Sequence, residues 1–158
     1  MVKCTFITLG ALKEDYLSRA TEEYKKRLSL FAEVTEINLK DEKLLTESAS
    51  EVTSALEKEA DAILAKIPEG AYTVALCVEG KEYSSEGFAE LIGNACDMQG
   101  KLCFIIGSSY GLSPRVKQRA QARVSFSKMT FPHGLMRVIL SEQVYRAFTI
   151  LSGKKYHK

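Results

Sequence analysis

The sequence predicts a single α/β domain, residues 1–158, built on a mostly parallel β-sheet flanked by helices. Three observations predict this fold class. Strand-like and helix-like segments alternate along the chain, the connections between them are short, and the central strand-like segments are apolar on both faces. Parallel strands need helical crossovers, and helices on both sides bury a parallel sheet, so this pattern is typical of the class.

The first half of the chain contains two strand–helix units. Its strand-like segments are apolar or alternating, whereas its helix-like segments place apolar side chains three and four residues apart. In chain order the predicted elements are strand 2–9, helix 13–29, strand 34–39 and helix 51–66. Residues 41–50 are polar and are expected to form a loop, to which the sequence assigns no role.

The second half continues the alternation with two near-continuous apolar runs, YTVALCV and LCFII, which indicate strands buried on both faces. Ser84 and Ser85 both suit the N-cap of one helix, Ser113 suits the N-cap of the next, and Pro114 suits a first helical position. Gly80 is expected to stop the strand before it. The predicted elements are strand 72–78, helix 85–98, strand 102–106, helix 114–122, strand 124–127, helix 135–151 and an irregular tail.

Charge is distributed unevenly although the formal net charge is only +2. Residues 1–100 hold 11 Lys and Arg against 19 Asp and Glu, whereas residues 101–158 hold 11 Lys and Arg against Glu142 alone. Such asymmetry predicts an anionic partner for the basic half, and nucleic acid is the usual candidate. The alternative is that the two halves neutralise each other in the fold.

The four cysteines form no CxxC pair and stand at no metal-ligand spacing from histidine, so reduced, mostly buried thiols in a cytoplasmic protein are expected. No apolar run approaches the ~20 residues of a membrane span, and the N-terminus lacks a secretory signal pattern. The C-terminal loops contain no paired acids, so neither hydrolysis by general acid–base catalysis nor divalent-metal chemistry is indicated.

Three loops follow the buried strands and are the predicted site. Ligands of open parallel sheets bind beyond the carboxyl ends of the strands, which here are Glu79-Gly80, Gly107–Gly111 and Met129–Gly134. The glycines of GSSYG would let backbone N–H groups approach a ligand. This loop lacks the defining residues of a dinucleotide or P-loop motif.

The predicted helix 135–151 is apolar around most of its circumference, so it should be buried on more than one side. The sheet is expected to cover one side and a second copy of the chain the other, which predicts a homodimer. The alternative is a helix enclosed within one subunit. The tail after it carries Tyr156, suited to stacking on a base, among lysines that suit phosphates.

Three sequence strings together, FSKMTFPHGLMRVILSEQVYRAF, FIIGSSYGLS and the terminal YHK, resemble the small SPOUT-class methyltransferases of bacterial 23S rRNA. The resemblance covers the whole chain. It implies a C-terminal trefoil knot, a homodimer, and transfer of a methyl group from S-adenosyl-L-methionine to N3 of a pseudouridine in ribosomal RNA. Carried over, the donor would contact Leu76, Gly107, Phe126, Ser127, Lys128, Met129, Thr130 and Phe131.

One residue departs from the family pattern, which commonly has two adjacent glycines where this chain has Gly107-Ser108. If position 108 needs a positive φ, serine costs about 1 kcal/mol. If it does not, the exchange is neutral. Affinity for the methyl donor is the property that depends on the answer.

The implied reaction removes the proton of the pseudouridine N3–H, because the neutral imide nitrogen has no available lone pair. His157, from either subunit, is the predicted base; Arg137 would offset the developing negative charge and Tyr156 would stack on the base. His133 is interpreted as shaping the turn that holds the donor. The predicted RNA-binding residues are Arg115, Lys117, Arg119, Arg123, Lys154, Lys155 and Lys158.

Two rival functions remain open at this point. One is a methyltransferase of the same fold that acts on another RNA site, such as a tRNA ribose oxygen. The other is a non-catalytic RNA-binding or ribosome-associated protein with a vestigial pocket, an interpretation that Ser108 sustains.

Overall fold

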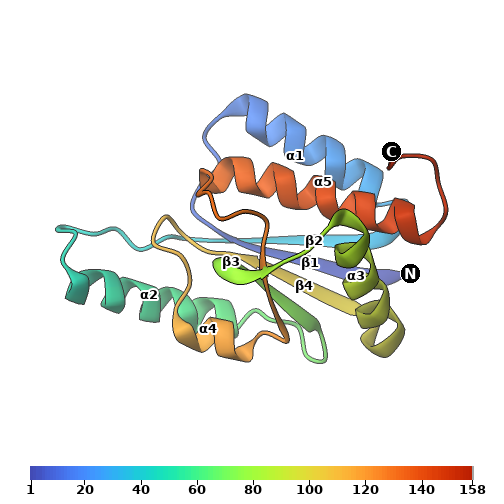
Figure 1. Cartoon of the computed structure of the whole chain (residues 1–158). Coiled ribbons are helices and arrows are strands. Elements are labelled where there is room, and N and C mark those ends of the chain that lie inside the picture. Colours follow the sequence, from blue (N-terminus) through green and yellow to red (C-terminus); the bar gives the residue numbers. More distant parts are fainter. Residues whose placement is uncertain (158) are drawn as a thin grey trace.

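The computed structural model describes residues 1–157 and contains a five-stranded, wholly parallel sheet. The strand order is β2-β1-β4-β3-β5, so the chain starts near one edge and later adds the other (Figure 1). The strands are β1 (Val2–Leu9), β2 (Ala32–Leu39), β3 (Tyr72–Glu82), β4 (Lys101–Ile106) and β5 (Ala122–Ser125). The predicted α/β class with a parallel sheet is confirmed.

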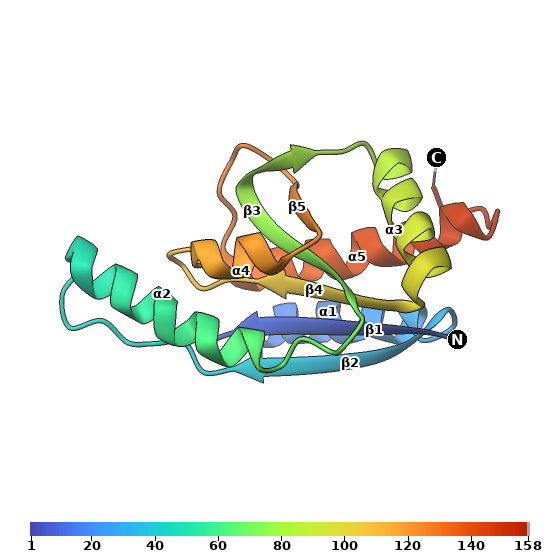
Figure 2. The same cartoon turned by 90° about the horizontal axis from the view of Figure 1, so that it is seen from below.

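Helices cover both faces of this sheet. Helices α1, α3 and α5 pack on one face, whereas α2 and α4 pack on the other (Figures 1 and 2). Their bounds are α1 (Asp15–Leu28), α2 (Ala49–Leu64), α3 (Ser85–Gln99), α4 (Pro114–Arg119) and α5 (His133–Leu151). None of the helices in the described part of the chain is long and apolar enough to cross a membrane.

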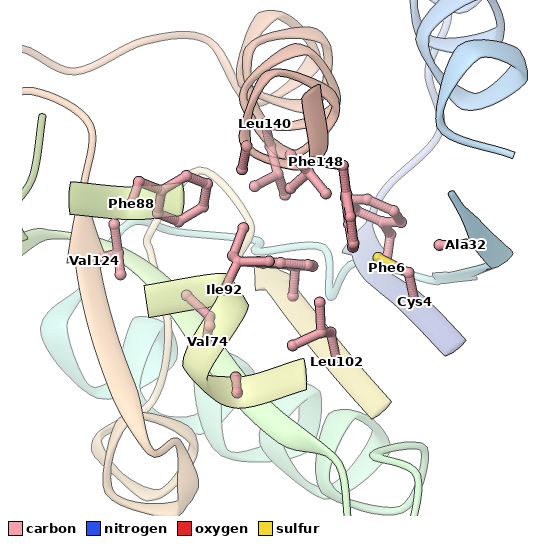
Figure 3. Close-up of a cluster of buried hydrophobic side chains, with 14 of the residues drawn as sticks. Cys4, Phe6, Ala32, Val74, Phe88, Ile92, Leu102, Val124, Leu140 and Phe148 are labelled. Atoms are coloured by element: carbon pink, nitrogen blue, oxygen red, sulfur yellow. The ribbon is translucent and has the colours of Figure 1, made fainter. Parts of the chain in front are cut away.

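Two apolar cores result, one on each side of the sheet. The larger core joins strand residues such as Phe6 and Phe104, whose rings stack 5.4 Å apart, to Ile92 of α3 and Leu140 of α5 (Figure 3). The second core packs Ile63 of α2 against the opposite face. Successive side chains of a strand point to opposite faces, so the apolar runs of β3 and β4 fill both cores at once.

Of the two predicted N-caps of α3, Ser84 is confirmed and Ser85 is not, and the predicted N-cap of α4, Ser113, is confirmed. The Ser84 hydroxyl accepts a hydrogen bond from Gly87 N at 3.0 Å, and the Ser113 hydroxyl accepts one from Arg115 N at 3.2 Å. Pro114 occupies the first position of α4, where its missing N–H costs nothing.

Several predicted boundaries were wrong. Strand β3 does not stop at Gly80 but continues to Glu82, because it resumes pairing with β5 there. Helix α4 ends at Arg119 instead of residue 122, since the chain must extend at Ala122 to join the sheet. Strand β5 spans Ala122–Ser125 instead of residues 124–127, because its pairing with β3 begins at Ala122 and ends at Ser125.

Helix α5 is enclosed more fully by its own subunit than we expected. It lies between α1 and α3 and also touches β4, so three elements share its apolar circumference. Gly134 admits Leu12 and Leu17 at close range, and Leu151 packs on Gly93 of α3. The premise that only the sheet would cover this helix is therefore wrong, and its apolar pattern by itself does not require a second copy.

Candidate active site

A cavity of about 740 Å³ lies beyond the carboxyl ends of β3, β4 and β5. All three loops that the strand-end rule selects contribute to it, together with the start of α5. Among the predicted donor-binding residues, those that line the cavity are Leu76, Gly107, Phe126, Ser127, Met129, Thr130 and Phe131. Lys128 is exposed and is not among the lining residues.

The loop after β4 makes a tight turn that needs both of its glycines. A Cβ on Gly107 would lie 2.3 Å from the carbonyl oxygen of Gly111, and Gly111 has a φ of 87°. The N–H of Gly111 closes the turn by donating to Ser108 O at 2.9 Å. The missing side chain of Gly107 thus lets the turn close on Gly111, and Gly107 itself lines the cavity.

Ser108 carries no backbone strain, because it is not among the residues with positive φ. Its departure from the family's glycine is therefore neutral for the turn. Instead its hydroxyl donates to Glu59 Oε1 of α2 at 2.8 Å, and Glu59 is only 4% exposed. The other oxygen of this carboxylate accepts from the N–H of Glu42 at 3.0 Å.

Helix α2 supports the same loop at further points. Glu57 accepts hydrogen bonds from the Ser113 hydroxyl at 2.6 Å and from Arg115 at 2.9 Å. These two hydrogen bonds, Ser113 first, lower the pKa of Glu57. Just before α2, Glu47 accepts from the Tyr110 hydroxyl at 3.0 Å. The acidic residues of this region thus hold the loop that forms one wall of the cavity.

A bulge in β3 forms the opposite wall. Both Leu76 and Lys81 pair with Val124 of β5, so residues 77–80 are extra and leave the ladder. Gly80 permits the bulge to close, because a Cβ there would lie 2.7 Å from the backbone of Val124. The bulge directs Cys77, Val78 and Glu79 into the lining of the cavity.

The loop after β5 closes the third side. The Ser125 hydroxyl donates to Ser127 O at 2.9 Å, and the Ser127 hydroxyl accepts from Met129 N at 2.9 Å. Phe126 meets Phe88 of α3 edge to face, with ring centroids 5.6 Å apart, which anchors the start of the loop in the main core. A single short segment therefore forms this wall, and Phe126 anchors the segment to the main apolar core.

Two opposite charges stand in this otherwise mostly neutral cavity. Among the described residues that line it, Glu79 supplies the carboxylate and Lys117 of α4 supplies the ammonium group. The two side chains form an ion pair, and the Lys117 hydrogen bond is the largest cause of a lowered pKa of Glu79. The site offers apolar walls, bare backbone and one charge of each sign.

Comparison with known proteins decides what this cavity belongs to. A family model described as "Predicted SPOUT methyltransferase" matches residues 2–157. The chain belongs to the SPOUT methyltransferase family. It is 48% identical to a Listeria monocytogenes protein over 96% of this chain and 97% of that one. It is also 47% identical to a Bacillus pumilus protein over 98% of each chain. Both relatives are named "Ribosomal RNA large subunit methyltransferase H".

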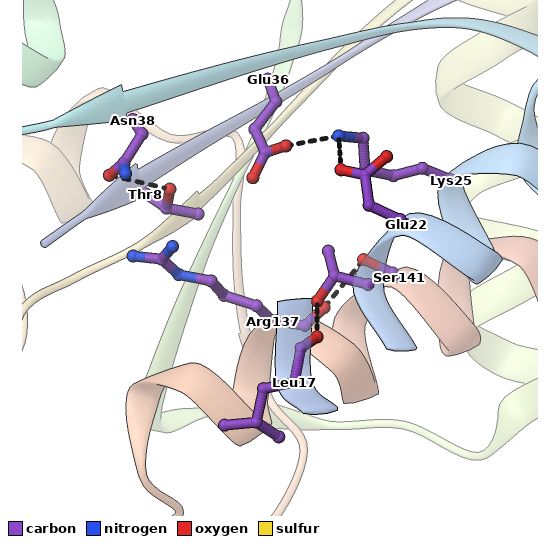
Figure 4. Close-up of polar contacts among 9 residues, drawn as sticks. Thr8, Leu17, Glu22, Lys25, Glu36, Asn38, Arg137 and Ser141 are labelled. Atoms are coloured by element: carbon purple, nitrogen blue, oxygen red, sulfur yellow. Dashed lines mark hydrogen bonds and ion pairs between the residues drawn. The ribbon is translucent and has the colours of Figure 1, made fainter. Parts of the chain in front are cut away.

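Arg137, predicted to act in catalysis, is buried in this SPOUT methyltransferase away from the lining of the cavity. It is 3% exposed, and its guanidinium donates to Leu9 O at 2.9 Å and Gly10 O at 2.5 Å. Its side chain reaches from α5 toward Thr8 of β1 (Figure 4). Burial lowers its pKa. These contacts fasten α5 to the end of β1.

The tail of the SPOUT methyltransferase packs on its own α5. His157 lies 2.8 Å from Glu86 Oε1 and 3.2 Å from Arg146, while Tyr156 donates to Glu142 at 3.2 Å. The Tyr156 ring meets Tyr145 edge to face at 4.8 Å. Neither tail residue lines the cavity of the same subunit. One chain therefore does not bring the predicted base and the donor site together.

The predicted RNA-binding residues divide into two groups. On α4 and β5, three cations already have partners in the fold: Arg115 pairs with Glu57 and Asp61, Lys117 pairs with Glu79, and Arg123 donates to Lys117 O. Neutralisation between the halves of the chain is therefore partly realised. Arg119, Lys154 and Lys155 are exposed, and Lys158 lies outside the described residues.

Sequence reasoning missed part of the lining of this methyltransferase. The strand-end rule indicated Glu79 but not Cys77 or Val78, because an apolar run gives no sign of a bulge. Lys117 was assigned to RNA, although its place in the last turn of α4 brings it to the cavity. Glu59 had no signal at all, since a single acid in a charged helix looks like any solvated residue.

Proposed function

We propose that this chain transfers a methyl group from S-adenosyl-L-methionine to N3 of a pseudouridine in large-subunit ribosomal RNA. One observation supports it most: seven of the eight residues carried over from the family as donor contacts line a single cavity, although they come from three separate loops. The relatives' name supports ribosomal RNA as the substrate. The reaction would then take place in the cytoplasm.

The cavity fits the proposed donor by its chemistry. Gly107 adds a wall without a side chain, and the apolar walls at Leu76, Phe126 and Phe131 suit an adenosine. The donor supplies a methyl group on a sulfonium. The chain's own residues hold that group in line with the incoming nitrogen and exclude competing water, which is where positioning contributes to rate.

A homodimer completes this proposal because the tail and the cavity are separate in one subunit. Arg146, which contacts His157, stands ten residues beyond the cavity-lining Met136 on α5. At 1.5 Å per residue that is about 15 Å along the helix. We infer that the tail of a second copy brings His157 and Tyr156 to the cavity. There His157 would accept the N3 proton while Tyr156 stacks on the base.

The RNA would follow the cations that keep free access to solvent. Arg119 on α4 and Lys155 in the tail are exposed. In a dimer these two groups come from different subunits and can flank one cavity. Phosphate contacts of this kind give affinity that depends strongly on salt.

Substrate choice is tested by incubating the purified protein with labelled S-adenosyl-L-methionine and, separately, assembled ribosomes, free ribosomal RNA and tRNA. We expect label in large-subunit ribosomal RNA, at a pseudouridine identified by mass spectrometry of nuclease fragments. Label in a tRNA ribose would assign the protein to another RNA site. Absence of label from every RNA, together with absence of donor binding in calorimetry, would leave a non-catalytic RNA-binding protein.

A further inference from the structure

We propose that Lys117 and Glu79 form a subsite for the amino-acid end of the methyl donor, with Lys117 binding its carboxylate and Glu79 its ammonium group. This inference rests on the proposed function. It assigns to a binding role two residues that the fold otherwise presents as a simple ion pair. The two residues come from different walls, Glu79 from the bulge of β3 and Lys117 from α4.

The charges of the cavity carry the inference. Apart from His133, the remaining described residues that line the cavity are apolar or neutral and polar. A donor whose end carries one carboxylate and one ammonium needs a partner for each, because an unpaired charge moved out of water is costly. Among the described lining residues, Lys117 and Glu79 are the two whose charges match.

The geometry of the pair allows it to accept such a ligand. Lys117 Nζ donates to Glu79 Oε1. An ammonium has three donors and a carboxylate has two acceptor oxygens, so each group can keep its partner and still bind the opposite charge of the donor. The Glu79 side chain is 60% exposed and the Lys117 side chain 26% exposed, so both can be reached from the cavity mouth.

The backbone fixes where each charge stands. Lys117 O accepts a hydrogen bond from the guanidinium of Arg123 at 2.9 Å, which ties α4 to β5 beside the cavity. The backbone of Glu79 is held in place because its neighbour Gly80 packs tightly against the backbone of Val124. The backbone positions of both residues are thus anchored beside the cavity.

The test compares two ligands that share the adenosine and differ in the amino-acid end: S-adenosylhomocysteine, and 5′-methylthioadenosine, which lacks that end. For Lys117→Met and for Glu79→Gln, calorimetry should show S-adenosylhomocysteine binding weakened about tenfold, the size of a lost charge-assisted hydrogen bond. Affinity for 5′-methylthioadenosine should change by less than about twofold. Lys81→Met and Glu82→Gln, in the same strand but outside the cavity, serve as controls.

A charge exchange separates ligand binding from a structural ion pair. The double variant Glu79→Lys with Lys117→Glu keeps opposite charges together but reverses their places. We expect it to bind 5′-methylthioadenosine normally and S-adenosylhomocysteine weakly. Full recovery of S-adenosylhomocysteine binding, or equal losses for the two ligands in the single variants, would overturn the subsite. If the unmodified protein binds neither ligand, the proposed function itself fails.

Discussion

Gly107 shows how a single position without a side chain can shape the wall of a cavity. Its Cα faces the carbonyl of Gly111 across the turn, where any Cβ would overlap the backbone. The sequence placed a glycine-rich loop after a buried strand, and this could be predicted. The sequence could not predict which of these glycines is indispensable, because that depends on the contact between residues 107 and 111, which only the folded turn creates.

We predict that Gly107→Ala weakens binding of S-adenosylhomocysteine by at least about tenfold and destabilises the fold by about 1–3 kcal/mol, the usual cost of overpacking. The turn must open by a large fraction of an ångström to admit the methyl group. Calorimetry and urea unfolding measure the two effects. Ser109→Ala, in the same turn, should leave the free energy of unfolding nearly unchanged, and unaltered ligand affinity in Gly107→Ala would contradict the placement of the donor.

Cys77 offers a chemical probe of the cavity wall. Its pKa is raised from an ordinary value of 9.0, chiefly by burial and then by the charge of Glu79. The thiol is therefore almost wholly protonated at pH 8, and its alkylation rate should rise about tenfold per pH unit and keep rising beyond pH 9, because the thiolate is the nucleophile.

Mass spectrometry of iodoacetamide-treated protein measures this rate for each cysteine separately. S-adenosylhomocysteine should slow the alkylation of Cys77 and leave that of Cys96, which is partly exposed outside the cavity, unchanged. A rate at Cys77 that levels off below pH 8 would contradict the raised pKa, and equal protection of both thiols would show that this wall is not where the ligand lies.

At the scale of elements, α2 acts as a support for the loop after β4. Its buried Glu59 joins Ser108 of the cavity wall to the backbone of Glu42, so the polar segment 41–50 is fixed by the same carboxylate. The helix itself was predicted from its apolar spacing. The supporting role of this region was not predicted, because the sequence does not show that Glu47, Glu57 and Glu59 contact a loop and not solvent.

We predict that Ser108→Ala destabilises the protein by about 1–2 kcal/mol, because it leaves one oxygen of a buried carboxylate without its donor. Glu59→Gln should cost less, since an amide can keep one acceptor and turn its donor toward the Ser108 hydroxyl. Urea unfolding of both variants, with Ser109→Ala as the matched control, checks the order. Equal stability of all three would show that the contact with Glu59 contributes nothing.

The boundaries that were wrong share a physical reason at this same scale. Strand β3 runs past Gly80 and α4 stops early because pairing with β5 decides both ends. Local residue propensities do not show which distant segments pair in the sheet. The buried strands and the capped helices were predicted correctly, since their signals lie within the segments themselves.

At the scale of the whole molecule, the separation of tail and cavity is the fact that most needs explaining. The polarity of charge predicted an anionic partner, and in one subunit Arg115 and Lys117 of the basic half are paired with acids of the first half. The C-terminal trefoil knot stays a prediction from the family resemblance. A second copy would supply the missing tail, so we regard the dimer as the functional unit.

We therefore expect subunits to complement each other. His157→Ala lacks the predicted base and Gly107→Ala lacks a sound donor site, so each should be poorly active alone. When the two are co-expressed with different affinity tags and the mixed dimer is isolated, one intact cavity faces one intact tail, and methyl transfer should recover to about half the normal rate per dimer. Recovery absent from a verified mixed dimer would place tail and cavity in the same subunit.

A crystal structure of the protein with S-adenosylhomocysteine tests the central claim most directly. We predict that the ligand lies between the bulge at Leu76, the turn at Gly107 and the loop 126–131, with the tail of a partner subunit beside it. A ligand bound elsewhere on the chain, or in this cavity of a subunit that has no partner near its mouth, would contradict it.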